Sequence, residues 1–259
     1  MNVAAGLRRE VAEALDRRAE RRWERAAEMA GRVDLATLET LRVRGRSLRS
    51  RIDRALHLVE ARLSQPDEGA GRVPLPLHAD WAWRPEPWAG PVSPKGHAAA
   101  ADGTPISADT KLFHDCPLAE CSLRQVRNIR AEDGAPFAVA LDVLAFEGSF
   151  LSLAVELPDE GSDGLKRRHV VTVTLDAVAE RATDFFARLN VRHGPNTEQL
   201  VLEGTLGDGA VEVEFDLGYS AIEAGMVTRA WVDLILEEPA MNRVLFRDVT
   251  LSRRPRAEL

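Results

Sequence analysis

Apolar residues return every three or four positions from about Val3 to Leu63, and this stretch contains no proline. Such a period predicts α-helix. In the first half, Leu7, Val11 and Leu15 form one stripe, which Trp23, Ala27 and Ala30 roughly continue before Gly31 interrupts the pattern. The sequence therefore predicts two helical stretches separated near Gly31.

Asp34 is suited to cap the second helix. Beyond it, apolar or small residues alternate between steps of three and four, at Leu38, Leu41, Gly45, Leu48, Ile52, Ala55 and Val59. This spacing is a heptad seam, typical of a coiled coil or a helical hairpin. We expect residues 34–63 to associate through it, with Gly45 as a weak point.

From about Lys111 onward the period changes to two. Phe137, Val139 and Leu141 alternate with other residues. The same pattern recurs up to the end of the chain, for example in residues 171–175, 187–191 and 232–236, with an irregularity near Arg247-Asp248. Eight or nine short segments of this kind, separated by turn residues such as Gly194-Pro195 and Gly207-Asp208-Gly209, predict antiparallel strands. The spacing leaves no room for crossover helices, which favours a β-sandwich, jelly-roll-like.

Between these two regions, residues 64–110 hold eight of the 14 prolines and three tryptophans, Trp81, Trp83 and Trp88. Proline excludes helix and sheet interiors, but a disordered spacer has no need of three indoles. The sequence thus predicts an α+β chain of several parts: a helical attachment segment (1–64), an extended arm that docks on its own domain or on a neighbouring subunit (65–110), and an antiparallel sandwich (111–259). Stacking of sugar rings on these indoles is an alternative.

Charge separates the same regions. Residues 1–64 contain 15 Arg, no Lys and 10 acidic residues, whereas the whole chain has a net charge of −7. Arg42, Arg46 and Arg49 belong to an arginine-rich stretch that is either an ordinary solvated helix face or a contact for an acidic protein. Direct nucleic-acid binding is disfavoured, because no aromatic residues alternate with these arginines for base stacking.

The sequence shows no membrane-spanning apolar run and no secretory signal, so we expect synthesis to end in the cytoplasm. The only cysteines are Cys116 and Cys121. Together with His114 they offer three possible zinc ligands, but in a spacing that favours two small buried thiols over a metal site. We therefore expect no metal and no cofactor.

The stretch RHGPNTEQL, from Arg192 to Leu200, raises the question of a catalytic His193. Gly194, Pro195 and Asn196 are turn residues, so the stretch predicts a strand-to-strand corner, with a ligand-contacting loop as the alternative. The acidic pairs Asp159-Glu160 and Glu237-Glu238 fall at strand ends, where solvated carboxylates are common. No phosphate-binding loop, nucleophile elbow or zinc-protease motif is present, and we expect no enzyme.

Two resemblances concern function. VLFRDVTLSRRP, near the C-terminus, is similar to the final strand of many carbohydrate-binding jelly-roll modules. Four segments carry a second resemblance: KLFHDCPLAECSLRQVRN, GSFLSLAVELP, ARLNVRHGPNTEQ and WVDLILEEPAMNRVLFRDVTLSRRPRAEL. In these segments the chain resembles an uncharacterised alphaproteobacterial family. That family is associated with gene transfer agents, in particular with the base of their head spike. This second resemblance implies a structural component of a phage-like particle, with capsid protein and spike fibre as partners, and no catalytic residues.

Two functions follow as hypotheses. The first is an adaptor that attaches a spike fibre to a capsid vertex as a homo-oligomer. Its contacts would come from Leu38, Leu41, Leu48, Ile52, Val59, Arg42, Arg46, Arg49, Trp81, Trp83 and Trp88. The alternative is a carbohydrate-binding module that recognises a surface polysaccharide. Sugar contacts would then fall to Tyr219 and Trp231, the only tyrosine and tryptophan after residue 110.

Overall fold

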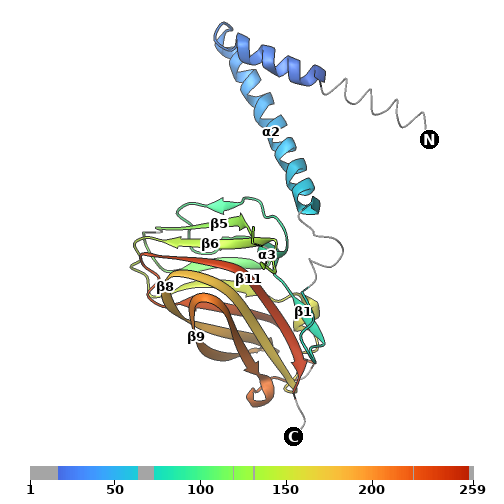
Figure 1. The fold of residues 1–259 in the computed structure, drawn as a ribbon, viewed down its shortest axis with the longest axis vertical. Coiled ribbons are helices and arrows are strands. Elements are labelled where there is room, and N and C mark those ends of the chain that lie inside the picture. Colours follow the sequence, from blue (N-terminus) through green and yellow to red (C-terminus); the bar gives the residue numbers. More distant parts are fainter. Residues whose placement is uncertain (1–16, 64–72, 119, 131, 224, 257–259) are drawn as a thin grey trace, which may run out of the picture. The chain divides into compact units, whose positions relative to one another are not determined.

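The computed structural model of the chain describes residues 17–63, 73–118, 120–130, 132–223 and 225–256, and gives the backbone alone for residues 50 and 53–63. The chain divides into two compact units, Met1–Val59 and Glu60–Leu259 (Figure 1). Within the described residues, the predicted arm therefore belongs to the same unit as the strands, instead of forming a separate part.

The helical unit contains a helix over residues 17–29 and the long helix α2 (Leu35–Leu63). Asp34 caps α2 as predicted: its carboxylate accepts hydrogen bonds from the Thr37 backbone N–H and hydroxyl, both at 2.9 Å. The Thr37 backbone bond is the main cause that lowers the pKa of Asp34, so the cap is ionised at neutral pH.

Gly45 of α2 lies against the first helix. A Cβ atom built at this glycine would meet the indole of Trp23 at 3.5 Å, an ordinary van der Waals contact, so the position also has room for a methyl group. The first helix turns Ala26 and Ala30 inward with Trp23, whereas Ala27 is exposed. The predicted stripe is therefore wrong at Ala27, because the neighbouring Ala26 is the half-buried residue. Trp23 of the first helix meets α2 at Gly45.

The second unit is built on one eleven-stranded antiparallel sheet, among the residues described. Short elements come first: β1 (Trp81–Trp83), α3 (Glu86–Ala89), β2 (Gly96–His97) and β3 (Thr104–Pro105). The remaining elements are β4 (Thr110–His114), β5 (Cys121–Arg127), β6 (Phe137–Val143), β7 (Leu151–Glu156), α4 (Asp159–Ser162), β8 (His169–His193), β9 (Asn196–Asp216), η1 (Leu217–Tyr219), β10 (Val227–Leu236) and β11 (Asn242–Pro255).

Strand β8 organises the sheet, because it pairs with different strands along its length. Residues 169–179 pair with β11, which continues to β6, β5 and β2; we call these strands the first half-sheet. Residues 185–193 pair with β10, which continues to β7, β4 and β3; these form the second half-sheet. On its other edge β8 pairs with β9 along nearly its whole length (Figure 1).

The two half-sheets pack their inner faces together. Alternate residues of both, including Val139, Leu141, Leu153, Val173 and Leu234, belong to one buried apolar cluster. The expectation of an antiparallel β-sandwich is confirmed at this level. The alternation that predicted strands is the same alternation that sends every second side chain into this core.

The strand count differs from the expectation at the bends. Residues 171–175 and 187–191, expected as two strands, are parts of β8, and Gly207-Asp208-Gly209, expected as a turn, lies inside β9. The pairing register shifts between Val178 and Thr183, opposite these glycines. Asn242 holds this bend, because its side chain accepts from the Arg181 N–H at 2.9 Å and donates to the Arg181 carbonyl at 2.8 Å. Glycine here serves a bend within a long hairpin and does not end a strand.

Two other predictions are confirmed. The register of β11 shifts between Phe246 and Asp248, where the irregularity was expected. His193 pairs with Asn196 across the two-residue turn Gly194-Pro195, and Gly194 has a φ of 54°, the left-handed conformation that the first position of a type II′ hairpin turn requires. The RHGPNTEQL stretch is thus the corner between β8 and β9. No helix within the described ranges is long and apolar enough to cross a bilayer.

Candidate functional site

The outer face of the second half-sheet carries aromatic, charged and polar side chains close together. In β10, Ala230, Val232, Leu234 and Leu236 enter the core, so Trp231, Asp233 and Ile235 lie on the opposite face. On the neighbouring strand β8 the same face carries Phe186, Arg188 and Asn190, which pair with Ile235, Asp233 and Trp231 in that order.

Strand β7 makes this face hollow. Two of its outward residues are small, Ser152 and Ala154, and each lies between larger neighbours on the adjacent strands, whereas the third, Glu156, lies at the end of the strand beside Trp231. Ser152 pairs with Phe113 of β4 on one side and with Ile235 on the other. A strand of small residues between two strands of large residues leaves a trough that runs along the sheet.

Three adjoining cavities follow this trough, and we call them together the outer-face groove. A cavity of about 210 Å³ and a central one of about 530 Å³ share Phe113, Trp231 and Asp233 in their walls. The central cavity shares Phe150 and Ile235 with an end cavity of about 720 Å³. The three cavities therefore adjoin one another along the trough, and Trp231 stands between two of them.

The floor of the groove is a polar network fixed by Asp233, whose side chain is buried. Arg188 donates to Asp233 Oδ2 from Nε at 3.0 Å and from Nη2 at 2.8 Å, and Asn190 Nδ2 donates to the same oxygen at 2.9 Å. Gln199 of β9 in turn donates to Asn190 Oδ1 at 2.9 Å. Charge-assisted bonds of this kind hold the planar groups rigidly in place before any ligand arrives.

Ser152 adds a polar atom without a partner. It is only 5 % exposed and lines the central cavity, and its hydroxyl has no hydrogen-bond partner among the described residues. A buried hydroxyl without a partner carries a free-energy cost.

Trp231 forms one wall between two cavities. The guanidinium of Arg229 lies 5.0 Å from its ring centroid, and Arg229 is itself held by two hydrogen bonds to Glu156, at 2.5 and 2.8 Å. These bonds raise the pKa of Arg229. The cation therefore remains against the indole and fixes its orientation.

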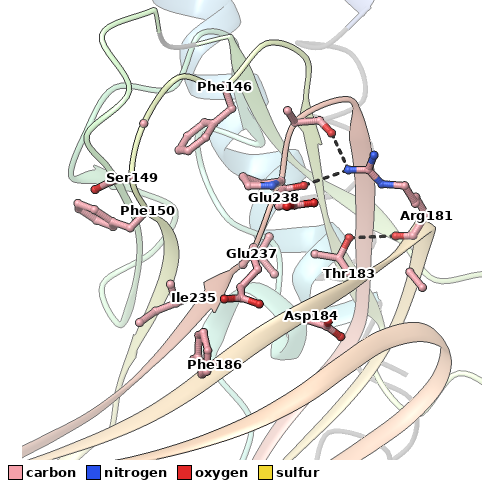
Figure 2. A pocket seen from close by; sticks show the side chains of 15 residues that line it. Phe146, Ser149, Phe150, Arg181, Thr183, Asp184, Phe186, Ile235, Glu237 and Glu238 are labelled. Carbon is pink, nitrogen blue, oxygen red and sulfur yellow. Dashed lines mark hydrogen bonds between the residues drawn. The ribbon is translucent and has the colours of Figure 1, made fainter.

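The end cavity lies between two loops and the bend of β8 (Figure 2). Arg181 Nη2 donates to the carbonyls of Glu238 and Ala240, both at 3.0 Å, which ties the bend to the β10–β11 loop. On the opposite wall, Asp115 accepts hydrogen bonds from Ser149 N at 2.7 Å and Oγ at 2.6 Å. The Ser149 hydroxyl is the main cause that lowers the pKa of Asp115. Both walls are thus held by polar contacts from neighbouring segments.

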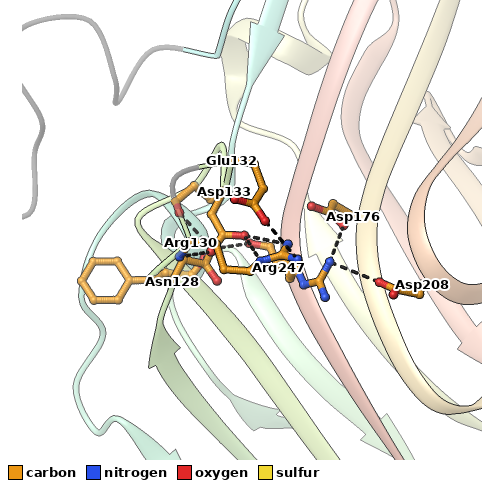
Figure 3. A network of polar contacts seen from close by, with 9 residues as sticks. Asn128, Arg130, Glu132, Asp133, Asp176, Asp208 and Arg247 are labelled. Carbon is orange, nitrogen blue, oxygen red and sulfur yellow. Dashed lines mark hydrogen bonds and ion pairs between the residues drawn. The ribbon is translucent and has the colours of Figure 1, made fainter.

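The outer face of the first half-sheet is different in character. Arg247 lies at the β11 bulge, 3.7 Å from Asp176 and 3.3 Å from Asp208, and Asn128 donates to the Arg247 carbonyl at 2.9 Å (Figure 3). Nearby, Arg130 binds Asp133 at 2.9 Å. These contacts fasten a loop to the sheet and fill the surface with paired charges.

Comparison with known proteins identifies the family. The model of a family of unknown function, DUF6478, matches residues 4–259. The chain belongs to this family. The description of DUF6478 names no function, so the expected link to gene transfer agents stays a prediction. No curated protein matches the chain.

Solved structures resemble this DUF6478 chain only distantly. The family 11 carbohydrate-binding module of Clostridium thermocellum, in complex with a β-1,3-1,4-mixed-linked tetrasaccharide, has 10 % identity and a TM-score of 0.38, over 61 % of this chain and 95 % of that one. The CBM22-1 xylan-binding domain of Paenibacillus barcinonensis Xyn10C has 10 % identity and a TM-score of 0.36, over 62 % and 94 %. The enzymatically active domain of tailspike protein 4 of bacteriophage CBA120 has 8 % identity and a TM-score of 0.41, over 60 % of this chain but 21 % of that one. At such TM-scores these likenesses carry no information about a ligand.

The two residues predicted for sugar contact are not brought together in DUF6478. Trp231 lies in the groove, whereas Tyr219 is 82 % exposed in η1 and is not among the described residues that line it. Arg256 covers the Tyr219 ring at 5.0 Å. Sequence reasoning missed Phe113, Phe150 and Phe186, because only tryptophan and tyrosine were considered as sugar platforms. Their signal was the outward parity of Phe113 and Phe186 in predicted strands.

The tryptophans expected to contact a partner serve their own domain. Trp88 is fully buried in the sandwich core and donates its indole N–H to the Phe246 carbonyl at 2.9 Å, so it offers no surface to another chain. Trp81 and Trp83 stack with ring centroids 6.3 Å apart and pack against the core, partly exposed. Of the two docking surfaces considered for the arm, its own domain is the one observed.

The helix residues expected in partner contacts are partly covered. Leu38, Leu41 and Leu48 are half-buried within the helical unit, and Ile52 is 49 % exposed. Arg42, Arg46 and Arg49 are exposed. The side chain of Val59 lies outside the described part of the chain.

The candidate zinc ligands have structural partners. His114 Nε2 bonds the Ala100 carbonyl at 2.8 Å, and its Nδ1 accepts from the Cys116 N–H at 3.2 Å. Cys116 and Cys121 are buried free thiols, and burial raises the pKa of Cys121. Among the described residues, no group of three or more His, Cys, Asp or Glu is arranged to hold a metal ion.

Proposed function

We propose that this protein is a saccharide-binding module and that the outer-face groove is its binding site. The observation that carries the proposal is the position of Trp231, which separates two adjoining cavities beside the rigid Asp233–Arg188–Asn190 network. Sugar rings have apolar C–H faces and a rim of hydroxyls. They suit a site that places an aromatic ring beside planar hydrogen-bonding groups.

Phe113 and Phe150 support the same assignment. They are 36 % and 39 % exposed and line the central cavity with Trp231. Three aromatic rings around one hollow form a surface for successive sugar units, and the unpartnered Ser152 hydroxyl lies on its floor. The charged side chains of the network donate to and accept from hydroxyls without needing to ionise a substrate. We therefore propose binding, without catalysis, as the activity.

The test is a glycan array followed by calorimetry with the best oligosaccharide. Trp231→Ala removes the stacking surface and is expected to weaken binding about tenfold or more, since about 1.4 kcal/mol corresponds to a factor of ten. Because Trp231 lies on the outer face, the melting temperature should change little. Tyr219→Ala is the matched control: it removes an exposed aromatic ring outside the groove and should leave affinity unchanged. Equal affinities of wild type and Trp231→Ala would refute the proposal.

We also propose that the helical unit joins a second copy of this chain, as an adaptor in a phage-like particle would require. The specific observation is the uncovered apolar surface of α2, where Ile52, on the heptad seam, is 49 % exposed. In the full-length chain, Ile52→Asp is expected to dissociate the oligomer in sedimentation experiments. Val43→Asp is the control, because Val43 is 65 % exposed but lies off the seam. A wild-type chain that sediments as a monomer would exclude self-association. Binding to capsid protein and spike fibre is part of the same proposal and calls for isolation of the intact particle.

A further inference from the structure

The groove is lined by more acidic than basic side chains. Its three cavities have seven carboxylates and four cationic groups in their walls. The acids are Asp102, Asp109, Glu156, Asp184, Asp233, Glu237 and Glu238, and the cations are Lys111, Arg181, Arg188 and Arg229. A concave surface with this excess has a negative potential, which geometry concentrates inside the hollow.

Most of the cations are already engaged by the protein. Arg188 binds Asp233 at 2.8 Å, and Arg229 binds Glu156 through two hydrogen bonds. Arg181 donates to two backbone carbonyls at the end cavity. An anionic ligand would have to displace these contacts to gain a counter-charge. Each displacement leaves a partly buried carboxylate or carbonyl without its donor.

The acidic excess is greatest in the end cavity, where Asp184, Glu237 and Glu238 face a single arginine (Figure 2). Glu237 and Glu238 are exposed on the loop that follows β10. Ionised carboxylates only accept hydrogen bonds, so they suit the donor hydroxyls of a neutral sugar. They repel a second carboxylate or a phosphate, which also only accepts.

We infer that the groove selects uncharged saccharide chains and rejects acidic ones. This inference rests on the proposed function and specifies its ligand class: neutral glycans, as opposed to polysaccharides that carry uronate or phosphate groups. Discrimination arises along the groove as a whole and is strongest next to Glu237 and Glu238.

The experiment uses the full-length chain and one pair of probes. The first probe is the neutral hexasaccharide that binds best on the array, and the second is the same hexasaccharide oxidised at C6 to the carboxylate. At low salt we expect the oxidised probe to bind at least about tenfold more weakly. The difference should shrink at 0.5 M salt, where charges are screened within a few ångströms. The double variant Glu237→Gln/Glu238→Gln removes two negative charges from the end cavity and should narrow the ratio of the two affinities several-fold.

Asp159→Asn/Glu160→Gln is the matched control, since it removes two exposed acids of α4 that do not line the groove. It should leave both affinities unchanged. An equal narrowing of the ratio in this control would show that only the net charge of the protein matters, and would overturn the inference. So would equal affinity of the wild type for both probes, while the saccharide function itself would stand. If the array shows no Trp231-dependent binding of any saccharide, the proposed function fails and this inference fails with it.

Discussion

The two outer faces of the sandwich are made by the same long strand and yet have opposite surfaces. On the first half-sheet, none of the outward positions of β5, β6, β11 and residues 169–179 carries an aromatic ring, and arginines pair with acids in succession. On the second, Phe113, Phe186 and Trp231 line a trough whose central strand carries Ser152 and Ala154. A face of paired charges without aromatic rings offers little to a small ligand, whereas a hollow with rings and fixed polar groups suits one.

The largest expected effect concerns stability and not binding. Asp248, on the first half-sheet, accepts two hydrogen bonds of 2.7 Å from Arg84, which is 6 % exposed. Asp248→Ala leaves that guanidinium buried without its counter-charge and is expected to cost about 3–5 kcal/mol in the free energy of unfolding. Urea denaturation measures this loss. Saccharide affinity of the folded variant should equal that of the wild type, and a parallel loss of affinity would mean that the two faces are coupled.

The corresponding change in the groove should affect binding more than stability. Asp233→Ala removes the acceptor of Arg188, whose side chain is 36 % exposed and can turn to water. We expect a cost of only about 1–2 kcal/mol in unfolding free energy. Affinity for the neutral oligosaccharide should fall about tenfold or more, because the groove loses the Asp233 carboxylate and Arg188 loses its fixed orientation. Unchanged affinity of this variant would show that the network takes no part in binding.

An intermediate test lies on the ion-pair surface. Asp142 is 3.5 Å from Arg124 and 3.4 Å from Arg243, and all three side chains are substantially exposed. Solvent-exposed pairs contribute little, so Asp142→Asn should lower the unfolding free energy by less than about 1 kcal/mol and leave affinity unaltered. Thermal melts and calorimetry check both. A large destabilisation would show that this surface works as a cooperative network.

The smallest effect is local and depends on pH. Hydrogen bonds from Ser149 lower the pKa of Asp115, so its contribution to the groove loop is present above the ordinary value of 3.8 and is lost as the pH falls through the lower value of the folded state. Below that value we expect the protection factors of the Ser149 and Phe150 amides, which compare their exchange with that of an unfolded chain at the same pH, to fall. Asp115→Ala should show the same low protection already at neutral pH. Slow exchange in that variant would mean that other contacts hold the loop.

Sequence patterns were most informative where a single rule determines whether each side chain is buried or exposed. The period of two placed Val139, Val173 and Leu234 in the core, because each outward or inward direction follows from parity alone. The alternation does not reveal which segments continue through a bend, so Gly207-Asp208-Gly209 was interpreted as a turn. It also could not tell whether an outward ring such as Phe113 is isolated or faces Trp231, because that depends on which strands become neighbours.

The docking of the arm was harder to predict for a related reason. Three clustered tryptophans indicated burial, but the strands against which β1 and α3 pack are β11 and β6, about 50 residues or more away in the chain. Trp88 lies in a core formed by strands that no pattern in the sequence connects with the arm. The candidate site likewise depends on the pairing of β4 with β7, of β7 with β10 and of β10 with β8, and none of these pairs joins strands that are consecutive in the chain.

The hairpin of β8 and β9 has a consequence for how the sandwich unfolds. Each half-sheet needs β8 as an internal strand, so neither can separate from the other without losing its own pairing. Melting should therefore be a single cooperative transition for the β unit, and its refolding should be slow because most partners are distant in sequence. A ligand bound to one face should therefore also slow the hydrogen exchange of amides on the opposite face.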